Sequence, residues 1–449
     1  MSEKEKIELS EEQSQVFQNI KEFINGNDND YCLLEGSAGS GKSTLVSFII
    51  RELLDTSLFG NICIAGTTHK CVKVLKAMCD HEITSKIGFS TVHSLLGMKC
   101  KITKEGKEVF ERDRQSVSKV PLYDFIIIDE VSMLVDELFN ELHDQNYKNI
   151  KVLFVGDSNQ INPINHTHSI PMLEEKRELF NIAHFKLTKV IRQAENNPII
   201  KFSRKVLNDE FSLDSGVKDI VDNTGVVMLG DQKDVLEGLL KYYFCSDKFD
   251  ENADYCRLIA WRNATVERFN HTIRRMKYGP KAGKVVINEK LIVDRPIKGE
   301  GVDNQAVLFH TNEDLIVRDI KETTKKLWDT EFKIYRTFVQ GDVEQDYIDI
   351  IHERYEGLYA QMLKKMADDA NSERDNFQRV SKWKKYFSFI DSFANVKYGY
   401  GITAHTSQGS TYDNAFVFYS DIMANRKEEE RKRIIYTSMT RPKNMLFMF

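Results

Sequence analysis

The stretch YCLLEGSAGSGKSTLVSFII, residues 31–50, sets the expected fold of the first part of this chain. Its apolar start, residues 31–34, predicts a buried strand, and its apolar end, residues 44–50, predicts an amphipathic helix. The residues between them are small and include Gly36, Gly39 and Gly41. A turn so poor in side chains brings backbone N–H groups to a helix N-terminus, where phosphate groups bind.

The turn has the full spacing of a P-loop, with four residues between Gly36 and the triplet Gly41-Lys42-Ser43. In such a loop the lysine reaches the β- and γ-phosphates and the hydroxyl binds Mg²⁺. We therefore predict a catalytic Lys42 and a metal-binding Ser43, and favour this interpretation over a glycine-rich turn with a surface lysine. The predicted ATP-binding residues of the loop are Gly36, Ser37, Ala38, Gly39, Ser40, Gly41, Lys42, Ser43 and Thr44.

The composition is that of an ordinary globular protein, with 41% hydrophobic and 29% charged residues among 449. No apolar run approaches the ~18 residues of a membrane span, and the N-terminus MSEKEKIELS lacks the apolar core of a signal peptide. We therefore expect no membrane partner. We also expect a cytoplasmic location, which would be the host cytoplasm if the chain is viral. Seven cysteines, an odd number, favour reduced thiols. The net charge of −5 excludes a histone-like charge but allows a narrow basic groove.

Short apolar runs alternate with helical stretches in two parts of the chain. The first set comprises residues 31–34, 62–65, 125–128 and 152–155, and the second comprises residues 226–229, 257–261, 415–419 and 445–449. This alternation predicts an α/β protein with two parallel sheets flanked by helices. Residues 97–120 predict an inserted β-hairpin that turns at Glu105-Gly106.

A second insertion is expected within the second α/β part. It begins with strand-like pieces at residues 285–293, 306–309, 315–317 and 332–339 and continues as long helical stretches from Asp346 onward. Near the C-terminus, the charged run 426–433 predicts a solvated helix face.

Two further strands end in polar side chains. In FIIIDEVSM, residues 125–133, Asp129 would complete the Mg²⁺ shell begun by Ser43, and Glu130 would orient or deprotonate the attacking water. In FVGDSNQINPI, residues 154–164, Gln160 would sense the γ-phosphate or position that water. A loop glutamine without a role remains the alternative for Gln160.

With these stretches assembled, the chain resembles the superfamily 1B helicases, the subgroup that includes RecD and the Dda helicase of T-even phages. The resemblance runs from Leu9 to Arg441, with the motifs in the family's order. The matching stretches are LSEEQ (9–13), GTTHK (66–70), STVHSLL (90–96), DEVSM (129–133), GDSNQINPI (156–164), LTKVIRQ (187–193), YGYGITAHTSQGST (398–411) and YTSMTR (436–441).

The resemblance implies roles for individual residues. Gln13 would recognise adenine, although it also lies three residues after Ser10, as in a capping box. Arg192 and Arg441 would be catalytic arginine fingers; lone arginines are otherwise surface ion-pair partners. Phe110, in the hairpin, would be the strand-separating pin, or would only pack the hairpin onto its neighbour. The residues that would contact DNA are Thr67, His69, Thr91, His93, Thr403, His405 and Gln408.

Two positions depart from the family pattern. Thr406 stands where the family usually has a lysine, which puts one charged contact with DNA or nucleotide in doubt. Pro442 follows Arg441, where the family usually has a small residue.

The resemblance also implies an organisation into two RecA-like P-loop domains, with an inserted β-hairpin and an inserted β-barrel-plus-helices domain. The expected ranges are 1–96 and 121–193 for the first domain, 97–120 for the hairpin, 194–285 and 394–449 for the second domain, and 286–393 for the insertion. The expected activity is that of an ATP-dependent DNA helicase that moves 5′ to 3′ on single-stranded DNA with ATP and Mg²⁺ as cofactors.

The expected partners are single-stranded DNA, duplex junctions, and replication or recombination proteins. Three alternatives remain: an ATP-gated clamp on nucleic acid, a translocase that displaces proteins without processive unwinding, and a P-loop kinase. DNA is favoured over RNA by the resemblance alone, because 2′-OH contacts cannot be read from motifs.

Overall fold

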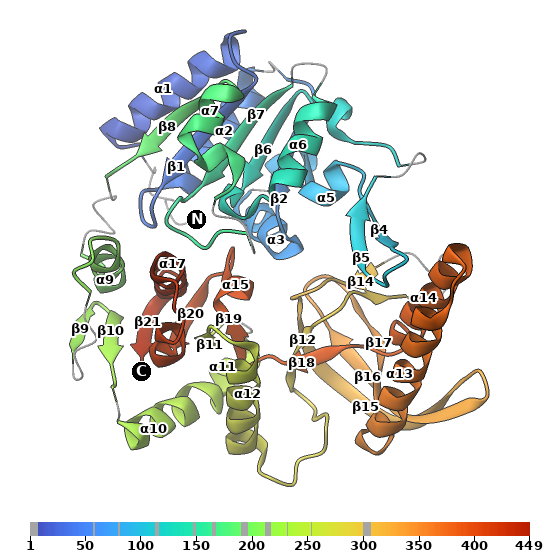
Figure 1. Cartoon of the computed structure of the whole chain (residues 1–449). Helices are drawn as coiled ribbons and strands as arrows, with labels where there is room; N and C mark the ends of the chain where they lie inside the picture. The colour runs from blue at the N-terminus through green and yellow to red at the C-terminus, as the bar shows by residue number, and fades with distance from the viewer. Residues whose placement is uncertain are drawn as a thin grey trace.

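The computed structural model describes residues 8–449 except 57–58, 80, 113–115, 147–149, 164–167, 190–195, 212–216, 231, 253 and 300–306. It holds two six-stranded sheets and one five-stranded sheet, each covered by helices (Figure 1). All seven cysteines are free thiols. Within the described ranges, no helix has the length and apolar character of a membrane span.

The first sheet is parallel throughout, with the strand order β3-β2-β6-β7-β1-β8. Its strands are β1 (Tyr31–Gly36), β2 (Ile62–Gly66), β3 (Ile87–Thr91), β6 (Phe125–Asp129), β7 (Lys151–Gly156) and β8 (Ile182–Leu187). The helices around it are α1 (Glu11–Asn25), α2 (Lys42–Thr56), α3 (His69–Met78), α4 (His81–Lys86), α5 (Val92–Leu95), α6 (Asp136–Gln145) and α7 (Glu174–Leu179), with 3₁₀ turns η1 (Val120–Leu122), η2 (Val131–Met133) and η3 (Ile170–Met172).

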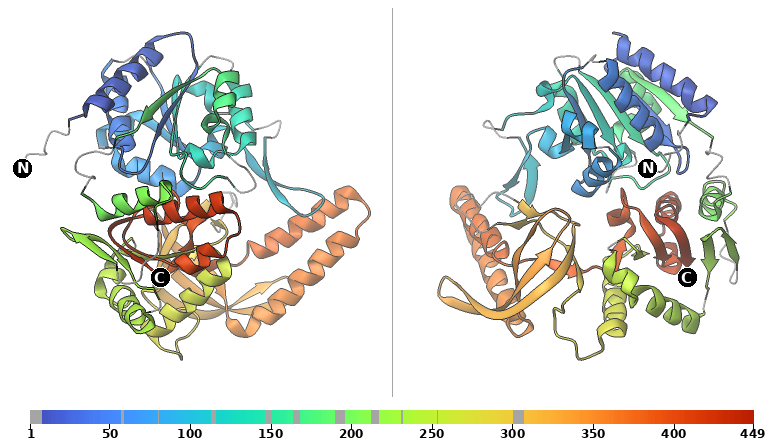
Figure 2. Two further views of the ribbon diagram at one scale, coloured as in Figure 1. Left: turned by 60° about the vertical axis from the view of Figure 1, so that its left-hand side comes forward. Right: turned by 180° about the vertical axis from the view of Figure 1, so that it is seen from behind.

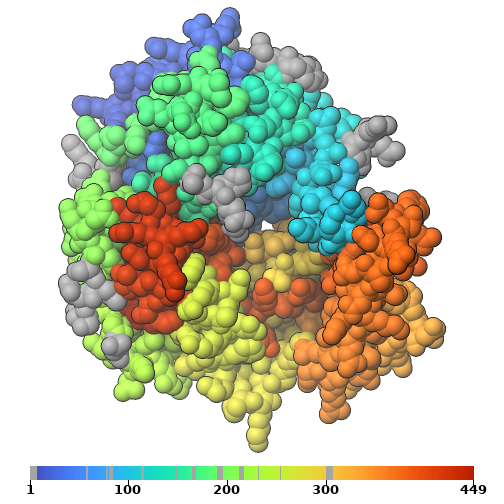
Figure 3. All heavy atoms as spheres, in the orientation of Figure 1, coloured from blue at the N-terminus to red at the C-terminus, as the bar shows by residue number. Residues whose placement is uncertain are grey.

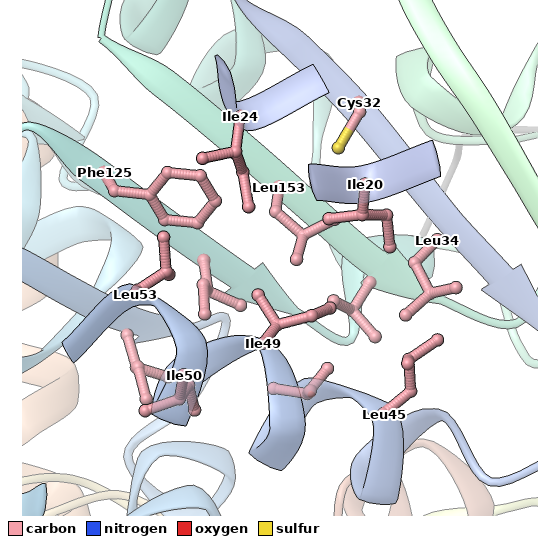
Figure 4. Packing of buried hydrophobic residues seen from close by; sticks show 14 of the residues in the cluster. Ile20, Ile24, Cys32, Leu34, Leu45, Ile49, Ile50, Leu53, Phe125 and Leu153 are labelled. Atoms are coloured by element: carbon pink, nitrogen blue, oxygen red, sulfur yellow. The ribbon is translucent and has the colours of Figure 1, made fainter. Parts of the chain in front are cut away.

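Both faces of this sheet are buried at its central strands, which is why β1, β2, β6 and β7 are largely apolar runs without alternation. Successive residues of β1 point to opposite faces, so Leu34 packs under α1 and α2 while Leu33 joins the core beneath α6. Figure 4 shows the first of these cores, where Ile20 of α1 and Ile49 of α2 lie against the sheet. Full burial of one such side chain contributes about 1.5–3 kcal/mol, so the packing holds the P-loop between rigid elements.

The second sheet has the order β19-β11-β20-β21-β10-β9 and is parallel except at its edge, where β9 pairs antiparallel with β10. Its strands are β9 (Lys218–Val221), β10 (Thr224–Met228), β11 (Cys256–Ala260), β19 (Gly401–Thr403), β20 (Tyr412–Val417) and β21 (Pro442–Met448). Its helices are α9 (Pro198–Leu207), α10 (Lys233–Phe244), α11 (Asp247–Glu251), α12 (Asn263–Tyr278), α15 (Ala404–Ser407), α16 (Tyr419–Met423) and α17 (Glu428–Met439). The predicted α/β class, with two parallel sheets flanked by helices, is confirmed.

The predicted hairpin is present as β4 (Lys99–Ile102) and β5 (Glu108–Glu111), paired antiparallel. Gly106 occupies its turn with φ of 72°, a left-handed conformation that favours glycine. A Cβ at this position would overlap the ring of Trp383. The tip of the hairpin therefore lies directly against the helices of the second insertion, as Figure 2 shows from two further sides.

The second insertion is built on a sheet with the order β17-β16-β15-β12-β18, antiparallel throughout. Its elements are β12 (Lys290–Val293), β13 (Ile297–Lys298), β14 (Val307–Phe309), β15 (Asp314–Leu327), β16 (Thr330–Gln340), β17 (Gln345–Ile351), η4 (Glu353–Tyr355), α13 (Glu356–Ser372), α14 (Asn376–Ile390) and β18 (Val396–Tyr398). Among the strands described, β17 and β18 are the two edges, so this sheet is open where we expected a barrel.

Three details of the insertion differ from the prediction. The helical stretch expected from Asp346 begins only at Glu353, because residues 345–351 form β17. The strand expected over 285–293 starts at Lys290. Finally, β18 belongs to the inserted sheet although it lies beyond residue 393, where we placed the end of the insertion.

Candidate functional site

A cavity of about 540 Å³ lies between the two parallel sheets and is lined by residues of both. The first domain contributes the P-loop, Asp129, Glu130 and Gln160, all at the carboxyl ends of β1, β6 and β7. The second domain contributes Arg441, just before β21. The structure thus brings together five residues from four separate segments of the sequence: Lys42, Asp129, Glu130, Gln160 and Arg441.

The P-loop wraps closely around its own lysine. Gly39 and Gly41 have φ of 79° and 81°, which a side chain would disfavour. The Lys42 ammonium donates to the carbonyl oxygens of Gly36 and, at 3.2 Å, of Ser37. Phosphate oxygens would replace these two carbonyl oxygens, because both kinds of oxygen accept hydrogen bonds from the same ammonium group.

The carboxylate pair that follows β6 is held in a strained turn. Glu130 has φ of 52°, unusual for a residue with a side chain, and its N–H donates to Asp129 Oδ1 at 2.8 Å. Burial, together with the neighbouring Glu130 carboxylate, raises the pKa of Asp129 above its ordinary value, against the opposing effects of the Glu130 N–H and of Lys42. A carboxylate in such a place is stabilised in its charged form by a cation.

The residues present fit an Mg²⁺ ion held together with a phosphate. Ser43 and Asp129 line the same cavity. Among the residues described, no cluster of three His, Cys, Asp or Glu side chains could hold a metal alone. Mg²⁺ commonly keeps several waters and takes one or two carboxylates plus substrate phosphates, which this pair of oxygen donors allows.

Gln13 has one of the two roles that its sequence left open, the capping box, and its recognition of adenine stays a prediction. It closes a capping box with Ser10, whose N–H donates to Gln13 Oε1 at 3.0 Å. Its Nε2 also donates to the carbonyl of Gly41 at 3.3 Å, which ties the start of α1 to the P-loop. Gln13 is 3% exposed.

Two residues that the sequence analysis did not single out connect the domains around this cavity. The Tyr436 hydroxyl accepts from the Ala38 N–H at 2.7 Å and donates to Asp157 Oδ2 at 2.8 Å. Arg433 donates to the carbonyl oxygens of Ser158 and, at 3.0 Å, Gln160. Both lie on α17, so the helix face expected to be solvated at Arg433 is instead part of the domain contact.

Gln408 lies in this contact, and it also lines a smaller cavity together with Thr67 and His405. We expected it to touch DNA, yet it is 6% exposed and donates to Ser132 Oγ at 3.0 Å and to Gln160 Oε1 at 3.1 Å. Its amide therefore links the second domain to the loop that carries Gln160. Arg192, the other predicted arginine finger, lies outside the described residues.

A second cavity, of about 510 Å³, brings together most of the predicted DNA contacts and Phe110. We call it the strand groove. Its lining includes Thr67, His69, Thr91, His93 and Phe110 from the first domain and hairpin, and Pro296, Val307, His310 and Thr311 from the insertion. In Figure 3 the molecule is hollowed at its centre, between the cyan hairpin region and the orange helices.

The remaining predicted contacts lie beside the groove or serve the fold. His405 and Thr406 line a smaller cavity of about 190 Å³ that also reaches Thr67. Thr403 caps α15 by accepting from the Thr406 N–H at 3.2 Å, and Thr91 caps α5 by accepting from the Ser94 N–H at 3.2 Å. Both hydroxyls serve as N-cap acceptors, which engages their oxygen lone pairs and not their donor protons.

A buried charge cluster joins all three domains next to the groove. Asp314, at the start of β15, pairs with Arg257 of β11 at 2.9 Å and with Lys70 of α3 at 3.3 Å. Lys70 also contacts the Tyr412 hydroxyl at 3.3 Å. Burial alone would raise the pKa of Asp314, but Arg257 and Lys70 outweigh it and hold this pKa at about 2.

We expect Asp314→Asn to lower the free energy of unfolding by about 3–5 kcal/mol near neutral pH, because two buried cations lose their counter-charge. Because the pKa of Asp314 is lower in the folded protein than its unfolded value of about 4, the ionised carboxylate stabilises the fold above about pH 4. This contribution to the free energy of unfolding is lost as the pH falls through about 2. The pH-dependent part amounts to about 2 kcal/mol. Urea unfolding of both proteins across acidic pH measures it. A gap between variant and parent that does not narrow at low pH would contradict this assignment.

The comparisons with known proteins agree with this geometry. An AAA domain family matches residues 21–166, which include the P-loop and the carboxylate pair. A UvrD-like helicase C-terminal domain family matches residues 398–448, which include Arg441.

Several known proteins are similar over most of the chain. Uncharacterized protein R530 of Acanthamoeba polyphaga mimivirus is 28% identical over 95% of this chain and 97% of its own length. The ATP-dependent DNA helicase dda of Enterobacteria phage T4 is 25% identical over 98% of this chain and 99% of its own length. The ATP-dependent RecD2 DNA helicase of Deinococcus radiodurans is 32% identical over 45% of this chain and 24% of its own length.

The fold is shared with a solved structure of Pif1 helicases at forked double-stranded DNA, with a TM-score of 0.50 and 14% identity over 98% of this chain and 92% of that one. Both conserved families and the full-length relatives point the same way as the motifs do. The chain is an enzyme that is similar to the superfamily 1B helicases, Dda and RecD among them.

Proposed function

We propose that this chain is an ATP-dependent DNA helicase that moves along single-stranded DNA and couples hydrolysis of Mg-ATP between its two parallel-sheet domains to strand separation. One observation carries the proposal: Lys42 of the first domain and Arg441 of the second line the same cavity. Nucleotide bound there would touch both domains, so its hydrolysis would change how they sit on each other.

Each residue of the cavity has a chemical task in this proposal. The backbone N–H groups of the P-loop and Lys42 would bind the phosphates, and Ser43 and Asp129 would hold Mg²⁺. Bound Mg²⁺ neutralises charge that develops on the transferred phosphoryl oxygens. Glu130 would accept the proton of the attacking water, and Gln160 would orient that water.

The helix α3 connects this chemistry to the strand groove. Its residues Cys71, Val74 and Leu75 line the nucleotide cavity, whereas His69, at its N-terminus, lines the groove. A ligand can move a protein only if it favours one arrangement over another. ATP bridging both domains would favour the closed cleft, and α3 would carry that closure to the strand.

The hydrolysis rate with and without single-stranded DNA or RNA tests the proposal. We expect strong stimulation by DNA. A P-loop kinase would be indifferent to the polymer, and an ATP-gated clamp would bind it with little turnover. Either result would refute the helicase activity.

Movement from 5′ to 3′ is the direction that the resemblance implies, and displacement of streptavidin from end-biotinylated oligonucleotides measures it. We expect release from the 3′ end, which a motor moving in that direction reaches. Release from the 5′ end alone would refute the direction and leave the helicase activity standing. A chain that releases streptavidin without unwinding a fork would be the protein-displacing translocase.

We expect Phe110→Ala to keep hydrolysis stimulated by single strands and to lose most of the unwinding of a forked duplex. Phe110 is 55% exposed at the mouth of the groove, and its ring lies 4.8 Å from that of His93. An exposed aromatic there can stack on the last base pair, at about 1–3 kcal/mol per base. Unwinding of a fluorescent fork measures the effect.

Phe377 gives a matched control, because it is an aromatic residue 85% exposed on α14 that lies outside the lining of the groove. Phe377→Ala should unwind like the parent. Equal loss of hydrolysis and unwinding in Phe110→Ala would reject the pin role.

A further inference from the structure

The inserted domain forms one wall of the strand groove through the turn between β14 and β15. Two backbone N–H groups hold this turn in place: the His310 N–H donates to the Glu313 side-chain Oε2 at 2.8 Å, and the Asn312 N–H donates to the carbonyl of Val293 in β12 at 2.8 Å. Asn312 has φ of 66°, a conformation in which asparagine is tolerated. The side chain of His310 is thereby presented from a fixed position.

His310 stacks on His69 across the domain boundary. The two ring centroids lie 3.4 Å apart and the rings are inclined by 13°. The buried ion pair between Lys70 of α3 and Asp314 of β15 fixes this arrangement. Burial lowers the pKa of both imidazoles, that of His69 to about 4, so the two rings stack without charge repulsion near neutral pH.

The chemistry of the groove suits a polyanion with flat apolar groups. Its described lining contains two lysines, Lys99 and Lys119, and no carboxylate, on a chain whose net charge is −5. Ser116, an 8% exposed residue of this lining, has a buried hydroxyl oxygen with no hydrogen-bond partner in the described part of the chain. Two aromatic pairs, His69 with His310 and His93 with Phe110, stand on its walls.

We infer that His310 is a strand-binding residue: the stacked His69–His310 pair is a platform for a base of single-stranded DNA, and the inserted domain is part of the strand-binding site. Histidine rings stack on unpaired bases as other aromatic side chains do, and this contact tolerates any base. This inference rests on the proposed function, because it names a further contact in the same groove.

We expect His310→Ala to bind single-stranded DNA about 10-fold more weakly, within the range for one lost base stack. Anisotropy of a fluorescein-labelled oligothymidylate on the full chain measures the affinity. His310→Phe should keep the parent's affinity, because it keeps the flat ring. The slope of log affinity against log salt should be the same in all three proteins, because no phosphate contact is lost.

An oligonucleotide that carries abasic sites separates stacking from any other loss. The parent should bind it more weakly than the intact strand, whereas His310→Ala should lose less on the same change. Asp342→Asn is the matched control, since it removes a contact between α3 and the insertion outside the groove lining, and should bind like the parent.

Three results would overturn the inference. His310→Ala could bind as tightly as the parent, His310→Phe could bind as weakly as His310→Ala, or Asp342→Asn could lose as much as His310→Ala. In each case the proposed function would still hold if single-stranded DNA stimulated ATP hydrolysis by the parent protein. A parent that neither bound nor responded to single strands would refute the proposed function, and the inference with it.

Discussion

Replacement of Arg441 by alanine is expected to lower the turnover number for ATP hydrolysis by about 10³- to 10⁵-fold, the range for a lost arginine finger. Its guanidinium lines the cavity opposite Lys42 and donates to the carbonyls of Thr437 at 2.9 Å and Ser410 at 3.2 Å. The charge is thus available to the γ-phosphoryl oxygens from the second domain. Steady-state hydrolysis with saturating single-stranded DNA measures the loss.

Arg441→Lys separates charge from geometry. A lysine keeps the positive charge but lacks the planar fork that contacts two oxygens, so it should restore only a small part of the rate. Because Arg441 is 7% exposed and bonded to backbone, thermal unfolding must show that both variants remain folded. A folded Arg441→Ala that hydrolyses ATP within about 10-fold of the parent would contradict the role of a finger.

Lys42→Ala is expected to lower hydrolysis by at least about 10²- to 10³-fold, as for other charged or polar groups aimed at a transition state. Its ammonium is held among the P-loop carbonyls, and no neighbouring lysine lines the cavity within the described residues. The strand groove is separate from this loop, so binding of single-stranded DNA should be largely retained. Hydrolysis and anisotropy on the same preparation measure both.

Lys21→Ala provides the control, because Lys21 belongs to the same domain and pairs with Glu52 away from the cavity. It should hydrolyse ATP like the parent. Hydrolysis retained in Lys42→Ala would mean that the P-loop assignment is wrong, whatever the groove binds.

Strands such as β1, β2 and β7 could be predicted because every residue in them is buried, which makes each a nearly continuous apolar run. The partly exposed strands β3, β8 and β9 were not predicted. β17 shows where this approach failed. Its sequence QDYIDII lies almost wholly in the stretch that was expected to be helical from Asp346 onward, but it forms a strand in which Asp349 pairs across the sheet with Lys325 at 2.6 Å. A partner supplied by another strand cannot be seen in a local pattern.

The nucleotide cavity was predictable from the sequence, whereas the contacts between the domains were not. Lys42, Asp129 and Gln160 follow apolar strands, and that order of residues is a local signal. In the sequence, Gln408 and Tyr436 are ordinary polar residues. The fold brings Gln408 into contact with Gln160, and Tyr436 into contact with Ala38 and Asp157. Both were within quoted motifs, and only the three-dimensional neighbours distinguish their tasks.

The return from the insertion to the second domain is unusually short. β18 ends at Tyr398 in the inserted sheet, and β19 starts at Gly401 in the parallel sheet, with the fully buried Tyr400 between them. The next residues, from Thr403 on, begin the helix that carries His405. Movement of the insertion is therefore coupled to movement of the segment that follows it. Excision of residues 286–393 would remove β12, the strand that pairs with β18, and would loosen the whole segment up to Gln408.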